Sequence, residues 1–153
     1  KQEVKDEFKD TEGKPEVKQR IRQLQYEMSQ RQMLQDVPDA DVVITNPTHF
    51  SVALKYDPES AGAPILLAKG HDHMALKIRE IAKLNDVEIV GSPPLARSIY
   101  HHSEIGQEIP SGLYMAVAQV LAYVFQLKQF RRRISPRPQK PDFPVPDDMS
   151  YDG

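Results

Sequence analysis

The hydrophobic positions of this 153-residue chain fall into short apolar runs separated by stretches with helical spacing. Residues 42–45 form a continuous apolar run of the kind that buried strands have. Residues 50–56 alternate apolar and polar side chains, which predicts a half-buried strand. Residues 65–68 are a further short apolar run, and residues 87–90 are apolar except for Glu88, so the pattern predicts four strands.

Helical spacing predicts three helices after the third predicted strand. The first spans about residues 73–85, with Asp72 as its N-cap, and its expected core residues are Met74, Ile78, Ile81 and Ala82. Because it lies between two predicted strands, it indicates a parallel βαβ unit with a right-handed crossover. A short helix is expected around residues 95–100. A long one starts near Pro110 and runs to about Phe130, and it has a wide apolar face made by Leu113, Val117, Val120, Leu121, Val124 and Leu127.

The two ends of the chain differ from the middle. Residues 1–13 are charged and read as a linker, and from Pro15 a narrow stripe at helical spacing predicts a projecting helix, formed by Val17, Ile21, Leu24 and Met28. This helix is either a solvated connector or a partner-binding helix. The last residues hold many of the 13 prolines and almost no apolar periodicity, so they predict a disordered or polyproline-like tail. The expected division is a linker with its helix (1–36), a compact α/β domain (37–130) and a proline-rich tail (131–153).

Composition narrows the function classes. Lys and Arg number 20 against 22 Asp and Glu, and the resulting net charge of -2 argues against a dedicated nucleic-acid binder. The chain has no cysteine, which excludes disulfides and thiol catalysis. No apolar run is long enough to span a bilayer. Because the chain begins with Lys1, it is expected to be a soluble piece of a longer protein.

Other candidate chemistry is weak. A metal site could use His71 and His73 as ligands, together with His49 or the pair His101-His102. However, no acidic residue at a metal-ligand spacing completes such a site. Loop histidines are the stronger interpretation, so no metal and no cofactor is expected. Ser51 and Ser92 lack the glycine-flanked elbow of a hydrolase nucleophile, and no glycine-rich phosphate loop exists.

The stretch Asn46-Pro47-Thr48-His49 carries the most specific chemistry. Asn-Pro is an ordinary turn initiator, and here it lies between two predicted strands. Pro47 has no N–H, so the usual attack of the following backbone nitrogen on the Asn side chain is closed. The reverse attack stays open: the Asn46 side-chain nitrogen can attack its own backbone carbonyl, close a succinimide ring and break the chain before Pro47. An amide resists this by resonance, so the turn would have to be held under strain.

The surrounding residues, 46–56, resemble the cleavage region of the FlhB family, the flagellar type III export switch proteins. Further similar blocks follow in the family's order at residues 68–70, 75–81, 93–100 and 105–122. Together they cover roughly residues 42–129. The stretch 50–56 and the proline-rich tail are nearer to the flagellar branch of the family than to the injectisome branch.

The resemblance implies a fold and a role. The fold is a small four-stranded mixed sheet surrounded by about four helices, on the cytoplasmic face of the bacterial inner membrane, with a membrane part preceding this chain. The family cleaves itself between the Asn and Pro of this motif and switches export from rod and hook substrates to filament substrates. Its implied partners are the other export-gate membrane proteins, the hook-length ruler protein, export substrates and the export ATPase complex.

Four residues make up the predicted site. Asn46 supplies the nucleophile and the scissile carbonyl, and Pro47 supplies a nitrogen that leaves as a secondary amine. Thr48 can hydrogen-bond within the turn, and His49 can carry a proton near neutral pH. The reaction is single-turnover, so the protein is not expected to be an enzyme acting on another substrate. The two products, residues 1–46 and 47–153, are expected to stay associated.

Three alternatives remain at this point. In the first, the domain is a docking module and cleavage is incidental maturation. In the second, it is a metal-dependent hydrolase that uses His49, His71, His73 and His101. In the third, it is the injectisome paralogue, with virulence proteins as cargo.

Overall fold

The computed structural model describes residues 14–47, 49–59, 62–132 and 136–150 of the chain. By contact density the chain divides into two units, residues 1–35 and 36–153. In the first unit, helix α2 (Pro15–Asp36) begins at the predicted proline, and its side chains Ile21, Leu24 and Met28 are exposed. That this helix projects from the domain stays a prediction.

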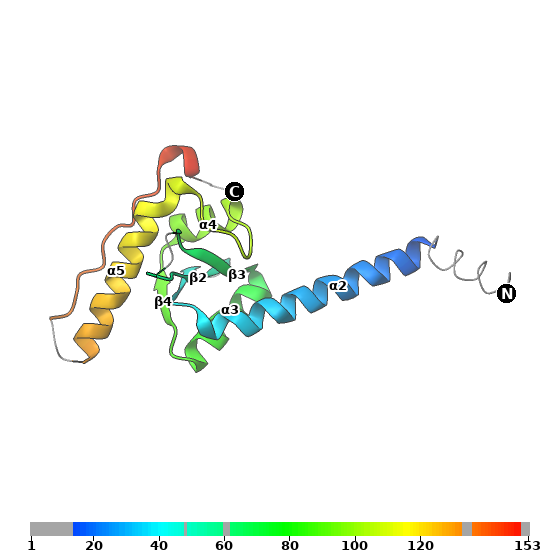
Figure 1. The fold of residues 1–153 in the computed structure, drawn as a ribbon, viewed down its shortest axis with the longest axis horizontal. Coiled ribbons are helices and arrows are strands. Elements are labelled where there is room, and N and C mark those ends of the chain that lie inside the picture. Colours follow the sequence, from blue (N-terminus) through cyan, green and yellow to red (C-terminus); the bar gives the residue numbers. More distant parts are fainter. Residues whose placement is uncertain (1–13, 48, 60–61, 133–135, 151–153) are drawn as a thin grey trace. The chain divides into compact units, whose positions relative to one another are not determined.

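The second unit is built on a four-stranded mixed sheet, as predicted (Figure 1). Its strands lie in the order β3-β2-β1-β4. The strands are β1 (Val42–Asn46), β2 (Phe50–Lys55), β3 (Ile65–His71) and β4 (Glu88–Gly91). Strand β1 is antiparallel to β2 and parallel to β4, and β2 is antiparallel to β3. Helix α3 (Asp72–Leu84) connects the two edge strands, which run parallel as the strand–helix–strand pattern predicted.

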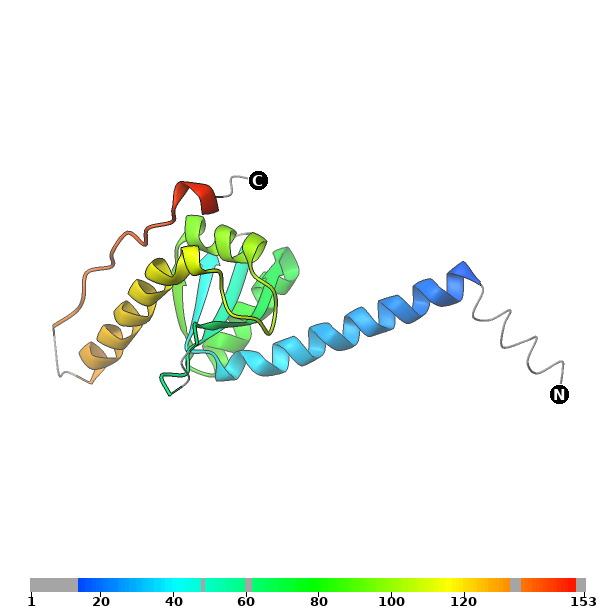
Figure 2. The same cartoon turned by 45° about the horizontal axis from the view of Figure 1, so that its top comes forward.

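Helices cover both faces of this sheet. Side chains of Val43 and Ala53 are fully buried on the face that packs against α3, where the Ser51 hydroxyl donates to the Ala75 carbonyl oxygen at 3.0 Å. On the other face the core is formed with α4 (Pro93–His102), the short helix η2 (Ser111–Leu113) and α5 (Tyr114–Arg131). Figures 1 and 2 show α5 running along this side of the sheet. The core residues on this side include Val42, Ile44, Val52, Leu54, Leu95, Ile99, Val117, Val120 and Val124.

Two details of the predicted elements are wrong. Strand β2 is not half-buried, because α3 covers the face that carries the small residues Ser51 and Ala53, both fully buried. Asp72 is not the N-cap of α3: strand β3 continues to His71, which takes that position, and Asp72 is the first helical residue with φ 50°. Pairing of His71 with Phe50 keeps the chain extended three residues longer than the apolar run suggested.

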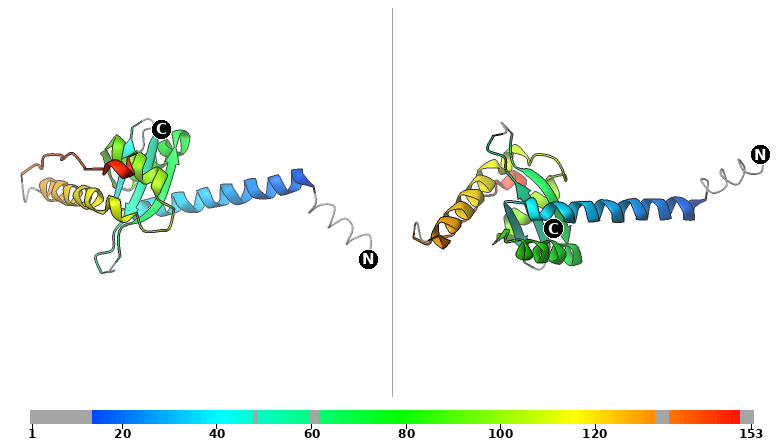
Figure 3. Two further views of the ribbon diagram at one scale, coloured as in Figure 1. Left: turned by 90° about the horizontal axis from the view of Figure 1, so that it is seen from above. Right: turned by 60° about the horizontal axis from the view of Figure 1, so that its bottom comes forward.

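The proline-rich end of the chain is anchored to the domain. Residues 136–150 contain no strand and only the short helix η3 (Asp147–Met149), which fits the lack of apolar periodicity. However, the segment runs back beside α5, as Figure 2 and the left view of Figure 3 show, and the Phe143 side chain is 7% exposed within the main core. The Ser98 hydroxyl donates to the Met149 carbonyl oxygen at 2.6 Å, and the Lys140 ammonium donates to the Gly91 carbonyl oxygen. One buried aromatic side chain and its neighbours thus contact the domain from residues 136–150, and the disordered or polyproline-like character of the tail stays a prediction.

Helix α3 ends in a hydrogen-bonded motif that favours glycine at a position held by Asp86. The Val87 N–H donates to the Ala82 carbonyl oxygen at 2.9 Å, the Asp86 N–H donates to that of Lys83 at 3.4 Å, and Asp86 has φ 57°. This is the Schellman arrangement, whose left-handed residue is most often glycine. We expect Asp86→Gly to raise the free energy of unfolding by about 0.5–1 kcal/mol, measured by urea denaturation. The same change at Asp142, which is not left-handed, is the control and should not stabilise; a less stable Asp86→Gly protein would contradict the argument.

None of the helices in the described ranges combines the length and the apolar character that crossing a bilayer requires.

Candidate functional site

The candidate site is the turn between β1 and β2. Asn46 is the last residue of β1 and Phe50 the first of β2, and the two are paired across the strands. Pro47 and His49 are exposed, whereas only 8% of Asn46 is exposed. Thr48 lies outside the described residues, so its predicted part in the turn stays a prediction.

The Asn46 carbonyl accepts a hydrogen bond inside this turn. The donor is the backbone N–H of His49, at 2.9 Å from the Asn46 carbonyl oxygen. Attack on a carbonyl carbon places negative charge on its oxygen, and a backbone N–H fixed at this distance stabilises that charge. The turn is therefore arranged to polarise the Asn46 carbonyl, the group that the Asn46 side-chain nitrogen would attack.

A second hydrogen bond holds the same turn from outside the hairpin. The backbone N–H of Asp72, the first residue of α3, donates to the His49 carbonyl oxygen at 3.0 Å. Among the described non-glycine residues, Asp72 is one of two with left-handed backbone, and such conformations carry strain. His49 is thus held through both its N–H and its C=O. Strain in the Asn46–Pro47 amide itself stays a prediction.

Rings from three elements gather next to the turn. The Phe50 ring stacks on that of Tyr100 in α4, with centroids 4.5 Å apart, and the His101 ring meets Phe50 edge-on at 5.4 Å. The His49 ring centroid lies 6.3 Å from that of Phe50. Burial, followed by the nearby charges of His102 and Lys69, lowers the pKa of His101, which favours a neutral ring beside Phe50.

The histidines do not assemble a metal site in the part of the chain that the structure describes. There, no three side chains of His, Asp or Glu come together in a way that could hold a metal ion. His71 instead faces the adjacent Asp72, with 3.1 Å between Nδ1 and Oδ2, and both side chains are largely exposed. The hypothesis of a metal-dependent hydrolase using His49, His71, His73 and His101 therefore has no geometric support.

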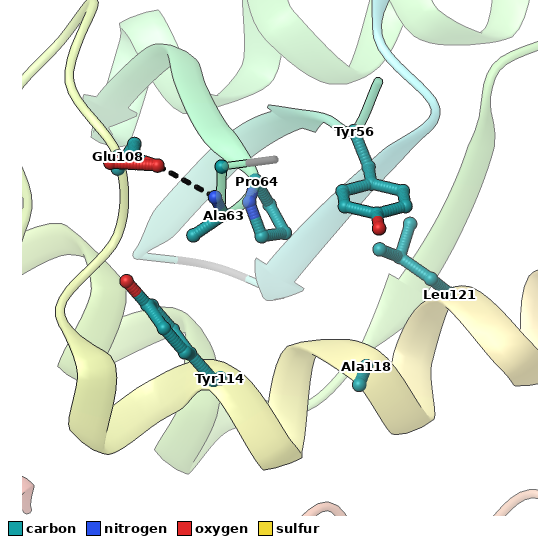
Figure 4. A pocket seen from close by; sticks show the side chains of 8 residues that line it. Tyr56, Ala63, Pro64, Glu108, Tyr114, Ala118 and Leu121 are labelled. Carbon is teal, nitrogen blue, oxygen red and sulfur yellow. Dashed lines mark hydrogen bonds between the residues drawn. The ribbon is translucent and has the colours of Figure 1, made fainter. Parts of the chain in front are cut away.

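A groove of about 630 Å³ lies on another part of the domain, between the start of β3 and α5 (Figure 4). Ala63 and Pro64 line one side, and Ala118 and Leu121 of α5 line the other. Figure 4 shows the Tyr56 and Tyr114 rings at its two ends, and the residues around it are Tyr56, Gly62, Ala63, Pro64, Glu108, Tyr114, Ala118 and Leu121. The Glu108 carboxylate accepts a hydrogen bond from the Ala63 N–H at 2.6 Å, which fixes the loop that forms one wall.

Comparisons with known proteins show which family this chain and its fold are similar to. A family model described as the FlhB HrpN YscU SpaS family matches residues 1–124. The flagellar biosynthetic protein FlhB of Salmonella typhimurium is 51% identical over 152 residues, which cover 99% of this chain and 40% of that protein. The chain therefore spans about two fifths of the length of this curated relative.

Solved structures give the same result. The crystal structure of the cytoplasmic domain of FlhB from Shewanella putrefaciens matches with a TM-score of 0.76 and 50% identity, over 80% of this chain and 95% of that one. A crystal structure of the EscU C-terminal domain, carrying an Asn-to-Asp substitution, matches with a TM-score of 0.58 and 29% identity, over 60% of this chain and 98% of that one. The fold is thus more similar to the FlhB domain than to the EscU domain.

Proposed function

Because the chain belongs to the FlhB HrpN YscU SpaS family, we propose that it is the cytoplasmic part of a flagellar type III export-gate component that cleaves itself between Asn46 and Pro47. In this proposal the domain lies at the cytoplasmic face of the bacterial inner membrane and switches export from rod and hook substrates to filament substrates. The greater similarity to flagellar FlhB than to EscU supports the flagellar assignment over the injectisome paralogue. The observation that best supports the proposed cleavage is the hydrogen bond from the His49 N–H to the Asn46 carbonyl oxygen.

In the reaction, one bond forms within Asn46 and the peptide bond between Asn46 and Pro47 breaks. The Nδ2 atom of Asn46 bonds to the Asn46 carbonyl carbon, the bond from that carbon to the Pro47 nitrogen breaks, and a succinimide ring closes. The side-chain amide loses one proton and the Pro47 nitrogen gains one, so the step needs no other reactant. Amide nitrogen is a poor nucleophile, so holding the reacting atoms in place contributes most of the acceleration.

His49 has two separate parts in this proposal. Its backbone N–H stabilises the charge that forms on the Asn46 carbonyl oxygen, 2.9 Å away. Its imidazole carries the proton from the side-chain amide to the leaving nitrogen, and its exposed position beside the turn gives it access to water. Thr48 restricts the shape of the turn through its hydroxyl.

The two products stay together after cleavage. Residues 1–46 retain β1, which pairs with β2 on one side and with β4 on the other, both of which belong to residues 47–153. Three β1 side chains are fully buried, namely Val42, Val43 and Ile44. Ladder hydrogen bonds and this buried apolar surface do not depend on the Asn46–Pro47 bond. Cleavage therefore changes the end of the hairpin, where it creates two new chain ends, and leaves the core in place.

The apolar groove is the surface that we assign to cargo docking. Its walls of Ala63, Pro64, Ala118 and Leu121 suit a short apolar segment of an export substrate, and its tyrosine ends provide hydroxyls for polar contacts. The groove is made largely by α5 and the loop before β3, so it remains intact when the hairpin is cut. Recognition and cleavage thus occupy different parts of one domain.

A charged side chain in the groove should weaken docking. We expect Ala118→Glu to reduce the affinity for a rod or hook substrate at least about ten-fold, because it places a carboxylate against apolar walls. Ala122→Glu is the matched control, since Ala122 is an exposed alanine one turn further along α5 and does not line the groove. Titration calorimetry with a purified substrate measures both. Equal loss in the two variants, or no loss in Ala118→Glu, would argue against the groove as the docking site.

A further inference from the structure

We infer that Lys69 and Tyr100 are positioning residues for the self-cleavage, because together they hold the Phe50 end of the hairpin that carries Asn46. The inference rests on the proposed function and assigns parts to two residues far from Asn46 in the sequence. Neither residue touches the reacting bond. Both act through Phe50.

Phe50 links helix α4 to the turn that carries Asn46. It is the cross-strand partner of Asn46, and partners in an antiparallel pair direct their side chains to the same face of the sheet. That face is the one covered by α4. The Phe50 ring and the Asn46 side chain therefore lie next to each other at the end of the hairpin, and a shift of Phe50 moves Asn46.

Tyr100 fixes the ring of Phe50. The two rings stack at 4.5 Å between centroids with 30° between their planes. The His101 ring closes the cluster, edge-on to Tyr100 at 5.0 Å and to Phe50 at 5.4 Å. Stacked and edge-to-face rings at these distances attract each other in a defined relative orientation, so α4 sets where Phe50 lies.

Lys69 fixes Tyr100 and the end of α4. Its ammonium donates to the Tyr100 carbonyl oxygen at 2.9 Å and to the Ser103 carbonyl oxygen at 2.8 Å. It also lies 5.1 Å from the centroid of the Tyr100 ring. A cation at the C-terminal end of a helix satisfies carbonyl groups that have no partner within the helix, and it interacts favourably with the helix dipole. A half-buried lysine of β3 thus ties the last turn of α4 to the sheet beside the hairpin.

These contacts differ from ordinary core packing. Phe50, Lys69 and Tyr100 are each half-buried, whereas the main core residues are fully buried. Changing them removes less buried apolar surface than a core substitution does. Small displacements of reacting groups have large effects on rate, so their loss should act on cleavage more strongly than on stability.

The test is a pulse of radiolabelled methionine in cell-free translation of the chain, followed by a chase on denaturing gels. Both products contain methionine, so both are visible. We expect Lys69→Met and Tyr100→Leu to slow cleavage about ten-fold or more, and Tyr100→Phe, which keeps the stacked ring, to stay within about two-fold of the unchanged chain. Val124→Ala is the matched control: it removes buried surface from α5, away from the turn, and should cleave at the unchanged rate.

Each outcome has a definite meaning. Cleavage at the unchanged rate in both Lys69→Met and Tyr100→Leu would overturn the inference, as would equal slowing in Tyr100→Phe and Tyr100→Leu. Equal slowing in Val124→Ala would also overturn it, because the effect would then follow general stability. If Lys69→Met fails to fold by circular dichroism, the two Tyr100 variants decide alone. The proposed self-cleavage itself fails in a different way, namely if the unchanged chain is not cut or if Asn46→Ala is cut.

Discussion

Asn46→Ala should leave the chain in one piece. The substitution removes the only nitrogen that the mechanism uses as nucleophile, while Pro47 and the His49 N–H remain. We expect the cleavage rate to fall by at least about a thousand-fold, in line with the loss of a nucleophile elsewhere. Denaturing gels of the purified variant should show a single band at full length.

The same variant should keep its fold. Asn46 is at the end of β1, and its pairing with Phe50 is made by backbone groups that alanine retains. The free energy of unfolding should change by less than about 2 kcal/mol. Asn85→Ala is the matched control, because Asn85 lies at the end of α3 and its side-chain amide donates to the Ile81 carbonyl oxygen of that helix. It should cleave normally, and two fragments from Asn46→Ala would contradict the mechanism.

The uncut variant Asn46→Ala also distinguishes two hypotheses: that cleavage switches partner recognition, and that the domain is a docking module in which cleavage is incidental. If cleavage changes recognition, the cut protein and Asn46→Ala should differ in affinity for the hook-length ruler protein or for export substrates. Equal affinities would favour incidental cleavage.

Phe143→Ala should release the end of the chain and destabilise the domain. The Phe143 side chain is 7% exposed and belongs to the main core, where its ring centroid lies 6.2 Å from that of Tyr123. Replacing a buried phenylalanine by alanine removes apolar contacts and leaves a cavity, so we expect a loss of about 3 kcal/mol in the free energy of unfolding. Urea denaturation measures this loss.

Phe125→Ala is the control for that experiment. It is the same substitution in α5, at a side chain that is 62% exposed, and it should change the free energy of unfolding by about 0.5 kcal/mol or less. If the two variants are equally stable, residues 136–150 do not contribute to the core. Faster cutting within residues 136–150 of Phe143→Ala by a protease of broad specificity would further support release of this segment.

The strands could be predicted because their apolar runs are short and local. Residues 42–45 read as a buried strand and residues 87–90 as a further strand, and both are strands within one residue of those bounds. The burial of β2 on both faces could not be read in the same way, because Ser51 and Ala53 look like solvent-facing residues until α3 is placed over them. Periodicity reports the character of a side chain, and its neighbours on other elements decide whether it is covered.

The tail shows a related limit. Its many prolines correctly predict the lack of helix and strand over residues 136–146. A single phenylalanine among prolines forms no periodic apolar pattern. The local sequence therefore does not predict that Phe143 enters the core.

The candidate site likewise contains residues that the sequence identifies and residues that only the fold brings together. Asn46, Pro47 and His49 are contiguous in the chain, and the chemistry of Asn-Pro identifies them without a fold. Lys69, Tyr100 and Asp72 come from β3, α4 and α3, and only the sheet order brings them to the hairpin. The candidate residues could therefore be named from the sequence, whereas the contacts that hold them could not.

We propose that Asn46 cuts its own chain by closing a ring, and a time course of intact mass under denaturing conditions tests this proposal. Ring closure adds no water, so the first-formed fragments, residues 1–46 and 47–153, should have masses that sum to the mass of the uncut chain. The fragment ending at Asn46 should then gain one water as its succinimide hydrolyses. A chain that remains whole, or fragments that already carry an added water at the earliest time, would contradict the account.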